Sequence, residues 1–92
     1  NIARMQSSDW AERAWCARCG SALWYRVTAP DVAGYGACEI PLGLLDDASG
    51  LRFEREIFAD CCPNAYAFAG AADRERLTRA ETFARFAPEV LR

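Results

Sequence analysis

The stretch WCARCGSALWYR, residues 15 to 26, decides the expected fold, because it joins a C-x-x-C turn to a strand-like run. Its two cysteines, Cys16 and Cys19, are separated by two residues and followed by Gly20. Two thiolates at this spacing can point into one tight turn and bind a single Zn²⁺ ion, while the glycine lets the backbone fold beneath them. The pattern therefore predicts a zinc knuckle with Cys16 and Cys19 as metal ligands.

This turn supplies only half of a closed zinc site, since structural zinc normally has four protein ligands. Two other interpretations of the cysteine pair stay open, a redox pair and an inert pair. A thioredoxin-type redox motif opens a helix, whose N-terminus lowers the thiol pKa, whereas this motif lies between expected strands. We therefore favour zinc over redox chemistry.

The residues around the motif carry the alternation of a half-buried strand. In residues 21–28, Leu23, Tyr25 and Val27 alternate with Ala22, Trp24 and Arg26. Residues 13–17 are expected to form a strand entering the C-x-x-C turn, and residues 32–40 a strand that pairs with 21–28 through a short turn at 29–31. Residues 1–6 are typical of the middle of a strand, so we expect an N-terminal portion to be missing. Residues 43–50 predict a loop and residues 51–60 a further strand, although the charged alternation of residues 51–60 also suits a short helix.

A short helix is expected near the end of the chain. Thr78 and Glu81 fit the S/T-x-x-E capping box, and Pro88 stops the helix. Its apolar positions are Ala80, Phe83, Ala84 and Ala87. The predicted fold class is therefore mostly β with one short C-terminal helix.

Length and composition restrict the class of protein. With 92 residues, of which 52% are hydrophobic, the chain is expected to be one globular domain over residues 1–92, small enough for a metal to help stabilise it. A net charge of −2 without a basic stripe argues against a nucleic-acid partner. No segment approaches the roughly 18 apolar residues of a membrane span, and no signal peptide is evident. We expect a cytoplasmic protein without a membrane partner.

The remaining titratable residues limit the chemistry. Histidine is absent, which removes histidine-based catalysis and histidine metal ligands. Cys38 shares its expected strand face with Val32 and Ile40, so we expect a small buried hydrophobe there. Adjacent Cys61 and Cys62 point in opposite directions if extended, so at most one of them is a plausible ligand.

A family resemblance follows from the combination of these motifs. SSDWAERAWCARCGSALWY, GLLDD at 43–47, EIFADCCPNAYAFAG and RLTRAETFARF resemble the C-terminal part of the glutathione-dependent formaldehyde-activating enzyme family, which includes centromere protein V. The positions that fit the family pattern are Ser7, Ser8, Arg13, Cys16, Cys19, Gly20, Ser21, Gly43, Leu45, Asp46, Asp47, Ile57 and Phe58.

The resemblance implies a fold and an activity. It implies a sandwich-like β-tent in which Cys16 and Cys19 close a structural Zn²⁺ site with a C-x-C from an upstream segment. A second, catalytic zinc is implied to be held by a further upstream cysteine cluster, and neither cluster lies in these 92 residues. The implied function is that of a carbon–sulfur lyase acting on adducts of glutathione, or a similar thiol, with an aldehyde. The isolated chain is expected to be inactive, and its catalytic residues are unknown.

Other residues of the pattern have simpler interpretations. Asp46 and Asp47 more often cap turns than act as acid and base. Ser21 and Arg13 are expected to support the knuckle and the sheet. The tryptophans are expected to belong to the core, with one of them open to a role beside a ligand cleft; they are Trp10, Trp15 and Trp24.

Two functions from different classes therefore remain open. The first is the carbon–sulfur lyase, active in the full-length parent protein. The second is a non-catalytic zinc-binding module used in assembly or interaction. In either case the zinc site must be completed by a missing N-terminal segment or by a second copy of the chain in a homodimer.

Overall fold

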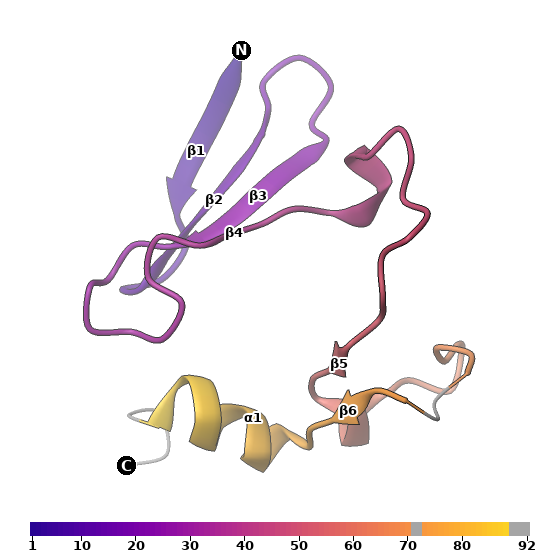
Figure 1. The fold of residues 1–92 in the computed structure, drawn as a ribbon. Helices are drawn as coiled ribbons and strands as arrows, with labels where there is room; N and C mark the ends of the chain where they lie inside the picture. Colours follow the sequence, from indigo (N-terminus) through magenta and orange to yellow (C-terminus); the bar gives the residue numbers. More distant parts are fainter. Residues whose placement is uncertain (71–72, 89–92) are drawn as a thin grey trace. The chain divides into compact units, whose positions relative to one another are not determined.

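The computed structural model describes residues 1–70 and 73–88 (Figure 1). Its elements are mostly strands followed by one short C-terminal α-helix, as the sequence predicts. The chain divides into two compact units, Asn1–Ser49 and Gly50–Arg92. Each unit is described by itself below.

The first unit contains a four-stranded antiparallel sheet in the order β1-β2-β3-β4 (Figure 1). Its strands are β1 (Ile2–Gln6), β2 (Ala11–Cys16), β3 (Ala22–Val27) and β4 (Cys38–Glu39). The strands expected at 1–6, 13–17 and 21–28 are therefore confirmed, and so is the pairing of 21–28 with the segment that follows it. The C-x-x-C motif lies where β2 turns into β3.

The expected strand over residues 32–40 is wrong except at its end. Turns and a bend occupy residues 30–36, and only Cys38 and Glu39 pair with β3. Gly34 and Gly36 have φ values of 85° and 81°, which a regular strand does not accommodate. Because β4 is so short and lies at the sheet edge, Cys38 is exposed, and the expectation of a small buried hydrophobe there is wrong.

The centre of the first unit lies on β2, where Ala11 and Ala14 are buried. All three tryptophans are half-buried, so they border this small core and do not fill it. A partly buried ion pair crosses the sheet from β2 to β3, with Arg26 Nη2 2.7 Å from Glu12 Oε1. The β2–β3 register shifts between Ala14 and Trp15, which marks a bulge just before the cysteine turn.

The loop expected at 43–50 is confirmed, apart from a short 3₁₀ helix, η1 (Leu42–Leu44), at its start. The strand expected at 51–60 is mostly wrong. Only β5 (Arg55–Glu56) forms, and it pairs in parallel with β6 (Glu75–Arg76). Phe58 then takes a φ of 53° and leads into a second 3₁₀ helix, η2 (Ala59–Cys61), which ends the extended conformation.

Helix α1 (Arg79–Phe86) confirms the predicted capping box. The Glu81 amide donates to Thr78 Oγ1 at 3.2 Å, and the Thr78 amide donates to Glu81 Oε1 at 2.9 Å. The expected apolar face is partly wrong, since Ala80 and Ala84 are exposed. The face that packs includes buried Thr82 and half-buried Phe83, whose ring meets the ring of Phe58 edge to face at 5.5 Å.

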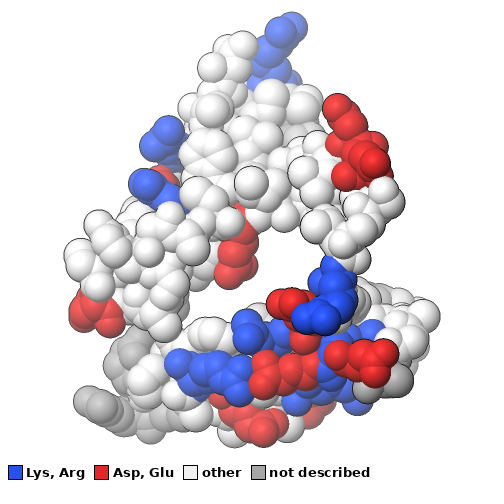
Figure 2. Space-filling view, in the orientation of Figure 1, with Lys and Arg blue, Asp and Glu red and all other residues white. Residues whose placement is uncertain are grey.

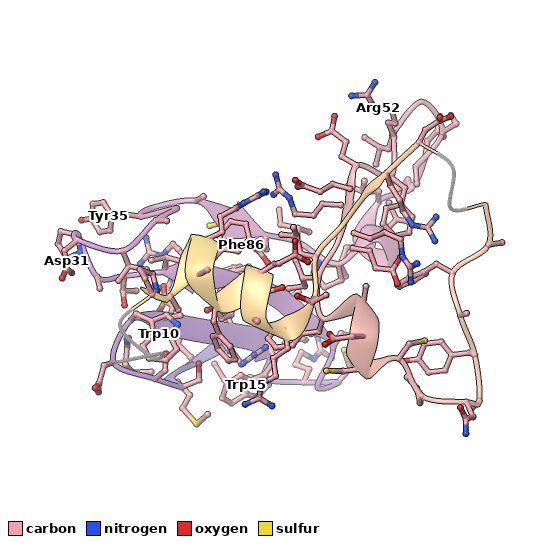
Figure 3. The ribbon with its side chains drawn as sticks, turned by 90° about the horizontal axis from the view of Figure 1, so that it is seen from below. Trp10, Trp15, Asp31, Tyr35, Arg52 and Phe86 are labelled. Carbon is pink, nitrogen blue, oxygen red and sulfur yellow. The ribbon has the colours of Figure 1, made fainter. Side chains whose placement is uncertain are left out.

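Charged side chains of both signs alternate over β5, β6 and α1 (Figure 2). Glu56 of β5 pairs with Arg74, which directly precedes β6; their side chains are 8% and 4% exposed, and the Oε2 and Nε atoms lie 3.0 Å apart. Arg74 also donates to the carbonyls of Ala69 and Gly70 at 2.9 and 2.8 Å. By contrast, Arg52 extends away from the ribbon into solvent (Figure 3).

The described part of the chain contains no helix long and apolar enough to cross a membrane.

Candidate metal centre

Backbone hydrogen bonds close the turn between β2 and β3. The Gly20 amide donates to the Cys16 carbonyl at 2.8 Å, and the Cys16 amide donates to the Ser21 carbonyl at 2.8 Å. Gly20 has a φ of 82°, a left-handed conformation that glycine adopts without the steric penalty of a Cβ atom. The sequence CARCG therefore folds into the tight turn that the motif predicts.

The turn brings the two predicted zinc ligands together. Cys16 begins the turn and Cys19 lies within it, three positions later, with Cys19 Sγ 3.3 Å from Ser21 Oγ. Cys19 is exposed, whereas Cys16, at the end of β2, is half-buried. Both sulfur atoms thus lie at one end of the hairpin, and one of them is open to solvent.

The surroundings of Cys19 favour its thiolate form. Hydrogen bonds from the side chain and backbone of Ser21 are the largest cause of a lowered pKa at Cys19, and the Cys16 thiol adds to the effect. Zinc is bound by thiolates, so a lowered pKa extends metal binding to lower pH. The donor set of the turn therefore fits two of the four positions around a Zn²⁺ ion.

The supporting roles expected of Ser21 and Arg13 agree with the geometry. Ser21 contributes its carbonyl to one cysteine and its hydroxyl to the other. Arg13 lies opposite Tyr25 in the β2–β3 ladder, with its guanidinium carbon 5.1 Å from the centre of the tyrosine ring. This stacking covers the sheet beside the turn.

A contact that the sequence does not reveal links the turn to the start of the chain. The Ala17 amide donates to the Asn1 carbonyl at 2.7 Å, and Ile2 pairs with Cys16 in the β1–β2 ladder. The sequence has no local signal that places β1 beside the cysteine turn, because the pairing of β1 with β2 joins residues that are distant in the chain. The first residues of β1 consequently lie beside the candidate metal ligands.

The described residues do not complete the metal site. Within residues 1–70 and 73–88, no three side chains of the His, Cys, Asp and Glu types are grouped so that they could hold a metal ion. Cys38 lies on β4 opposite Arg26. Among the described residues, the turn therefore offers two thiol ligands and no third one beside them.

Cys61 and Cys62 belong to the second unit and have different partners. Cys61 Sγ lies 3.6 Å from Asp60 Oδ1, while Cys62 Sγ lies 3.1 Å from the Tyr66 carbonyl oxygen. Partial burial, followed by the negative charge of Asp60, raises the pKa of Cys61. This divergence agrees with the expectation that the two cysteines do not act together as a chelating pair.

Asp47 has the turn-capping role that we favoured. Its Oδ1 atom accepts hydrogen bonds from the Ser49 hydroxyl and, at 2.9 Å, from the Ser49 amide. These two bonds lower the pKa of Asp47. Its neighbour Asp46 is exposed.

A hollow of about 280 Å³ opens along the edge of β3 in the first unit. Its lining combines one carboxylate with aromatic and apolar side chains: Ala22, Trp24, Tyr25, Glu39, Ile40 and Pro41. Trp24 is thus the tryptophan that borders this open hollow. Its indole Nε1 atom is buried and has no hydrogen-bond partner among the described residues.

Comparison of the chain with family models, with curated proteins and with solved structures gave no match. The cysteine turn and the motifs around it are therefore the features from which a function can be inferred.

Proposed function

We propose that this chain contributes a two-cysteine zinc knuckle to a zinc-dependent carbon–sulfur lyase-type protein, as the C-terminal portion of a β-tent domain. The observation that carries the zinc part of the proposal is the turn at Cys16–Ser21. There, two cysteines three positions apart lie at the end of a hairpin whose backbone is closed by two bonds of 2.8 Å.

In this proposal Cys16 and Cys19 hold a structural Zn²⁺ ion. Gly20 shapes the turn, Ser21 positions the Cys19 sulfur, and the β1–β2–β3 sheet keeps the turn rigid. The two remaining ligands are proposed to come from a segment on the N-terminal side of Asn1 or from a second copy of the chain. Since Ile2 lies beside Cys16, a segment continuing from β1 would start close to the turn.

The substrate class proposed from the resemblance is an adduct of an aldehyde with glutathione or a related thiol. When bound at a catalytic position, zinc supplies Lewis-acid chemistry and lowers the pKa of a thiol. None of the described residues is assigned a catalytic role in this reaction. The 92 residues alone are therefore proposed to be inactive as an enzyme, in a cytoplasmic parent protein that is active.

The second candidate function is a non-catalytic zinc-binding module. It is favoured by the same incomplete donor set, because two copies that each provide Cys16 and Cys19 make a four-thiolate site. A shared zinc ion of this kind holds a dimer together without any catalytic residue.

The coding sequence on the N-terminal side of Asn1 separates the two candidates. A C-x-C motif together with a further cysteine cluster there supports the lyase, because those residues would complete a structural and a catalytic site. If that sequence contains no cysteine clusters, the module is supported and the lyase is excluded.

Cobalt substitution tests thiolate ligation directly. Co²⁺ in a tetrahedral thiolate site gives intense sulfur-to-metal charge-transfer absorption. We expect this absorption in the reduced protein, and we expect Cys16→Ser and Cys19→Ser to abolish it while Cys38→Ser, at an exposed cysteine on β4, retains it. Equal absorption in all of these proteins would show that the turn is not the metal site.

A further inference from the structure

We propose that the Cys16–Cys19 pair, when it holds no metal, closes into an intramolecular disulfide by exchange with a small-molecule disulfide, with Cys19 as the residue attacked first. This reaction uses the same turn as the proposed zinc site but does not require that zinc binds there. It makes the turn a thiol–disulfide switch whose oxidised form has lost both metal ligands.

The first support is the closeness of the two thiols. Cys16 and Cys19 are three positions apart in a turn that is closed by two backbone hydrogen bonds of 2.8 Å, from the Gly20 amide to the Cys16 carbonyl and from the Cys16 amide to the Ser21 carbonyl. Disulfide formation requires two cysteines whose β-carbons approach within about 4.5 Å without backbone rearrangement. In a turn of this shape, rotation of the Cys16 and Cys19 side chains is expected to bring the two sulfur atoms together without a change in the backbone.

The second support is the difference in exposure between the two cysteines. Cys19 is exposed, whereas Cys16 is half-buried at the end of β2, next to Ile2 of β1. A dissolved disulfide therefore reaches the sulfur of Cys19 more easily. Cys16 is placed to attack the mixed disulfide from within the turn.

The exchange takes place in two steps. In the first, the Cys19 thiolate attacks one sulfur of glutathione disulfide, a Cys19–glutathione disulfide forms, and one glutathione thiolate leaves. In the second, Cys16 loses its proton to water and attacks Cys19 Sγ, and the second glutathione thiolate leaves. The two cysteine thiols are oxidised by two electrons, and one glutathione disulfide is reduced to two glutathione thiols.

The other cysteines lack this arrangement and provide an internal control. Cys61 and Cys62 are adjacent, but their sulfur atoms contact different oxygen atoms, of Asp60 and Tyr66. Cys38 is exposed on β4. We expect glutathione disulfide to leave these three as thiols or as mixed disulfides with glutathione.

The positions of the arginines allow a direct assay. Cleavage after Arg13, Arg18 and Arg26 places Cys16 in the peptide 14–18 and Cys19 in the peptide 19–26. Reduced, chelator-treated protein is incubated with glutathione disulfide, quenched with acid and a thiol-blocking reagent, digested with trypsin and analysed by mass spectrometry. We expect the two peptides to be recovered mainly as one cross-linked species.

The two cysteine variants identify the order of attack. Cys16→Ser is expected to accumulate glutathione on the peptide 19–26, whereas Cys19→Ser is expected to react more slowly at Cys16. Wild-type protein that ends with glutathione on the peptide 19–26 and no cross-link would overturn the proposal. Faster modification of Cys16 in Cys19→Ser than of Cys19 in Cys16→Ser would overturn the assigned order.

Repeating the assay with added zinc separates this inference from the proposed function. Loss of the cross-link when zinc is added supports both. A cross-link that forms equally with and without zinc supports the disulfide switch and contradicts zinc binding at the turn. Absence of the cross-link from the metal-free protein contradicts the switch and leaves the cobalt experiment as the test of the zinc site.

Discussion

The Sγ atom of Cys19 lies 3.3 Å from the Oγ atom of Ser21, two positions after the second cysteine of the C-x-x-C motif. This contact explains why a serine follows the glycine in CARCGS. The serine backbone closes the turn on Cys16, and its hydroxyl stabilises the thiolate of Cys19. Ser21 therefore both closes the turn and favours the thiolate form of Cys19.

Ser21→Ala is expected to raise the pKa of Cys19, because the hydroxyl group is the largest cause of its lowering. A higher pKa leaves less thiolate at a given pH, so the pH profile of Cys19 alkylation should move to higher pH. Ser21→Thr keeps a hydroxyl group and serves as the matched control. Alkylation of the peptide 19–26, followed by mass spectrometry, measures the profile, and identical profiles in all three proteins would refute this role of Ser21.

Gly20→Ala is expected to destabilise the first unit by about 1 to 2 kcal/mol, because a Cβ atom is disfavoured in the left-handed conformation. The matched control is Gly43→Ala, since an added Cβ atom meets nothing within 4 Å at either position and only Gly20 has a positive φ, of 82°. Urea unfolding followed by tryptophan fluorescence reports on this unit, which contains all three tryptophans. Equal unfolding midpoints for the two variants would contradict the conformational argument.

Glu56→Ala is expected to destabilise the second unit by about 3 to 5 kcal/mol, because it leaves a buried guanidinium without its carboxylate. That guanidinium belongs to Arg74, whose side chain is 4% exposed. Glu54→Ala is the control, since Glu54 pairs with Arg52 at 68% and 81% exposure and such pairs contribute at most about 1 kcal/mol. The circular dichroism of α1 during urea unfolding measures the difference, and similar losses in both variants would argue against the buried pair.

Glu75 makes the stability of the second unit depend on pH in the acid range. Hydrogen bonds from Arg85 and then Arg55 lower the pKa of Glu75 from 4.5 to about 2 in the folded state. The folded-state pKa is therefore below the unfolded-state value, so the stabilisation is complete above pH 4.5 and is lost as the pH falls toward 2.

Glu75→Gln is expected to remove this dependence. The variant should be less stable than the wild type at neutral pH, and the difference in urea midpoint should shrink between pH 4.5 and pH 2. A difference that stays constant across this range would show that ionised Glu75 is not the stabilising group.

Local signals in the sequence were sufficient for part of the fold. The alternation in 21–28 predicted β3, and the pair Thr78 and Glu81 predicted the start of α1. Both patterns describe interactions between residues close together in the chain. The turn at Cys16–Ser21 was predictable for the same reason, because its ligand spacing and its glycine lie within six residues.

Predictions that depended on distant partners were less successful. Within the strands expected at 32–40 and 51–60, only β4 and β5 form, since a strand forms only where a neighbour pairs with it. The exposure of Cys38 follows from that loss of pairing. The face of α1 that packs is set by Phe58, which lies 25 positions before Phe83 and carries no helical signal.

The central claim is that Cys16 and Cys19 bind zinc, and native mass spectrometry of reduced protein with added zinc tests it most directly. For the 92-residue chain we predict one zinc ion shared by two chains, with both the metal and the dimer lost in Cys16→Ser and Cys19→Ser and kept in Cys38→Ser. A zinc-free monomer at saturating zinc would contradict a site shared by two copies of the chain, and zinc that stays bound after both turn cysteines are replaced would contradict the claim that Cys16 and Cys19 bind it.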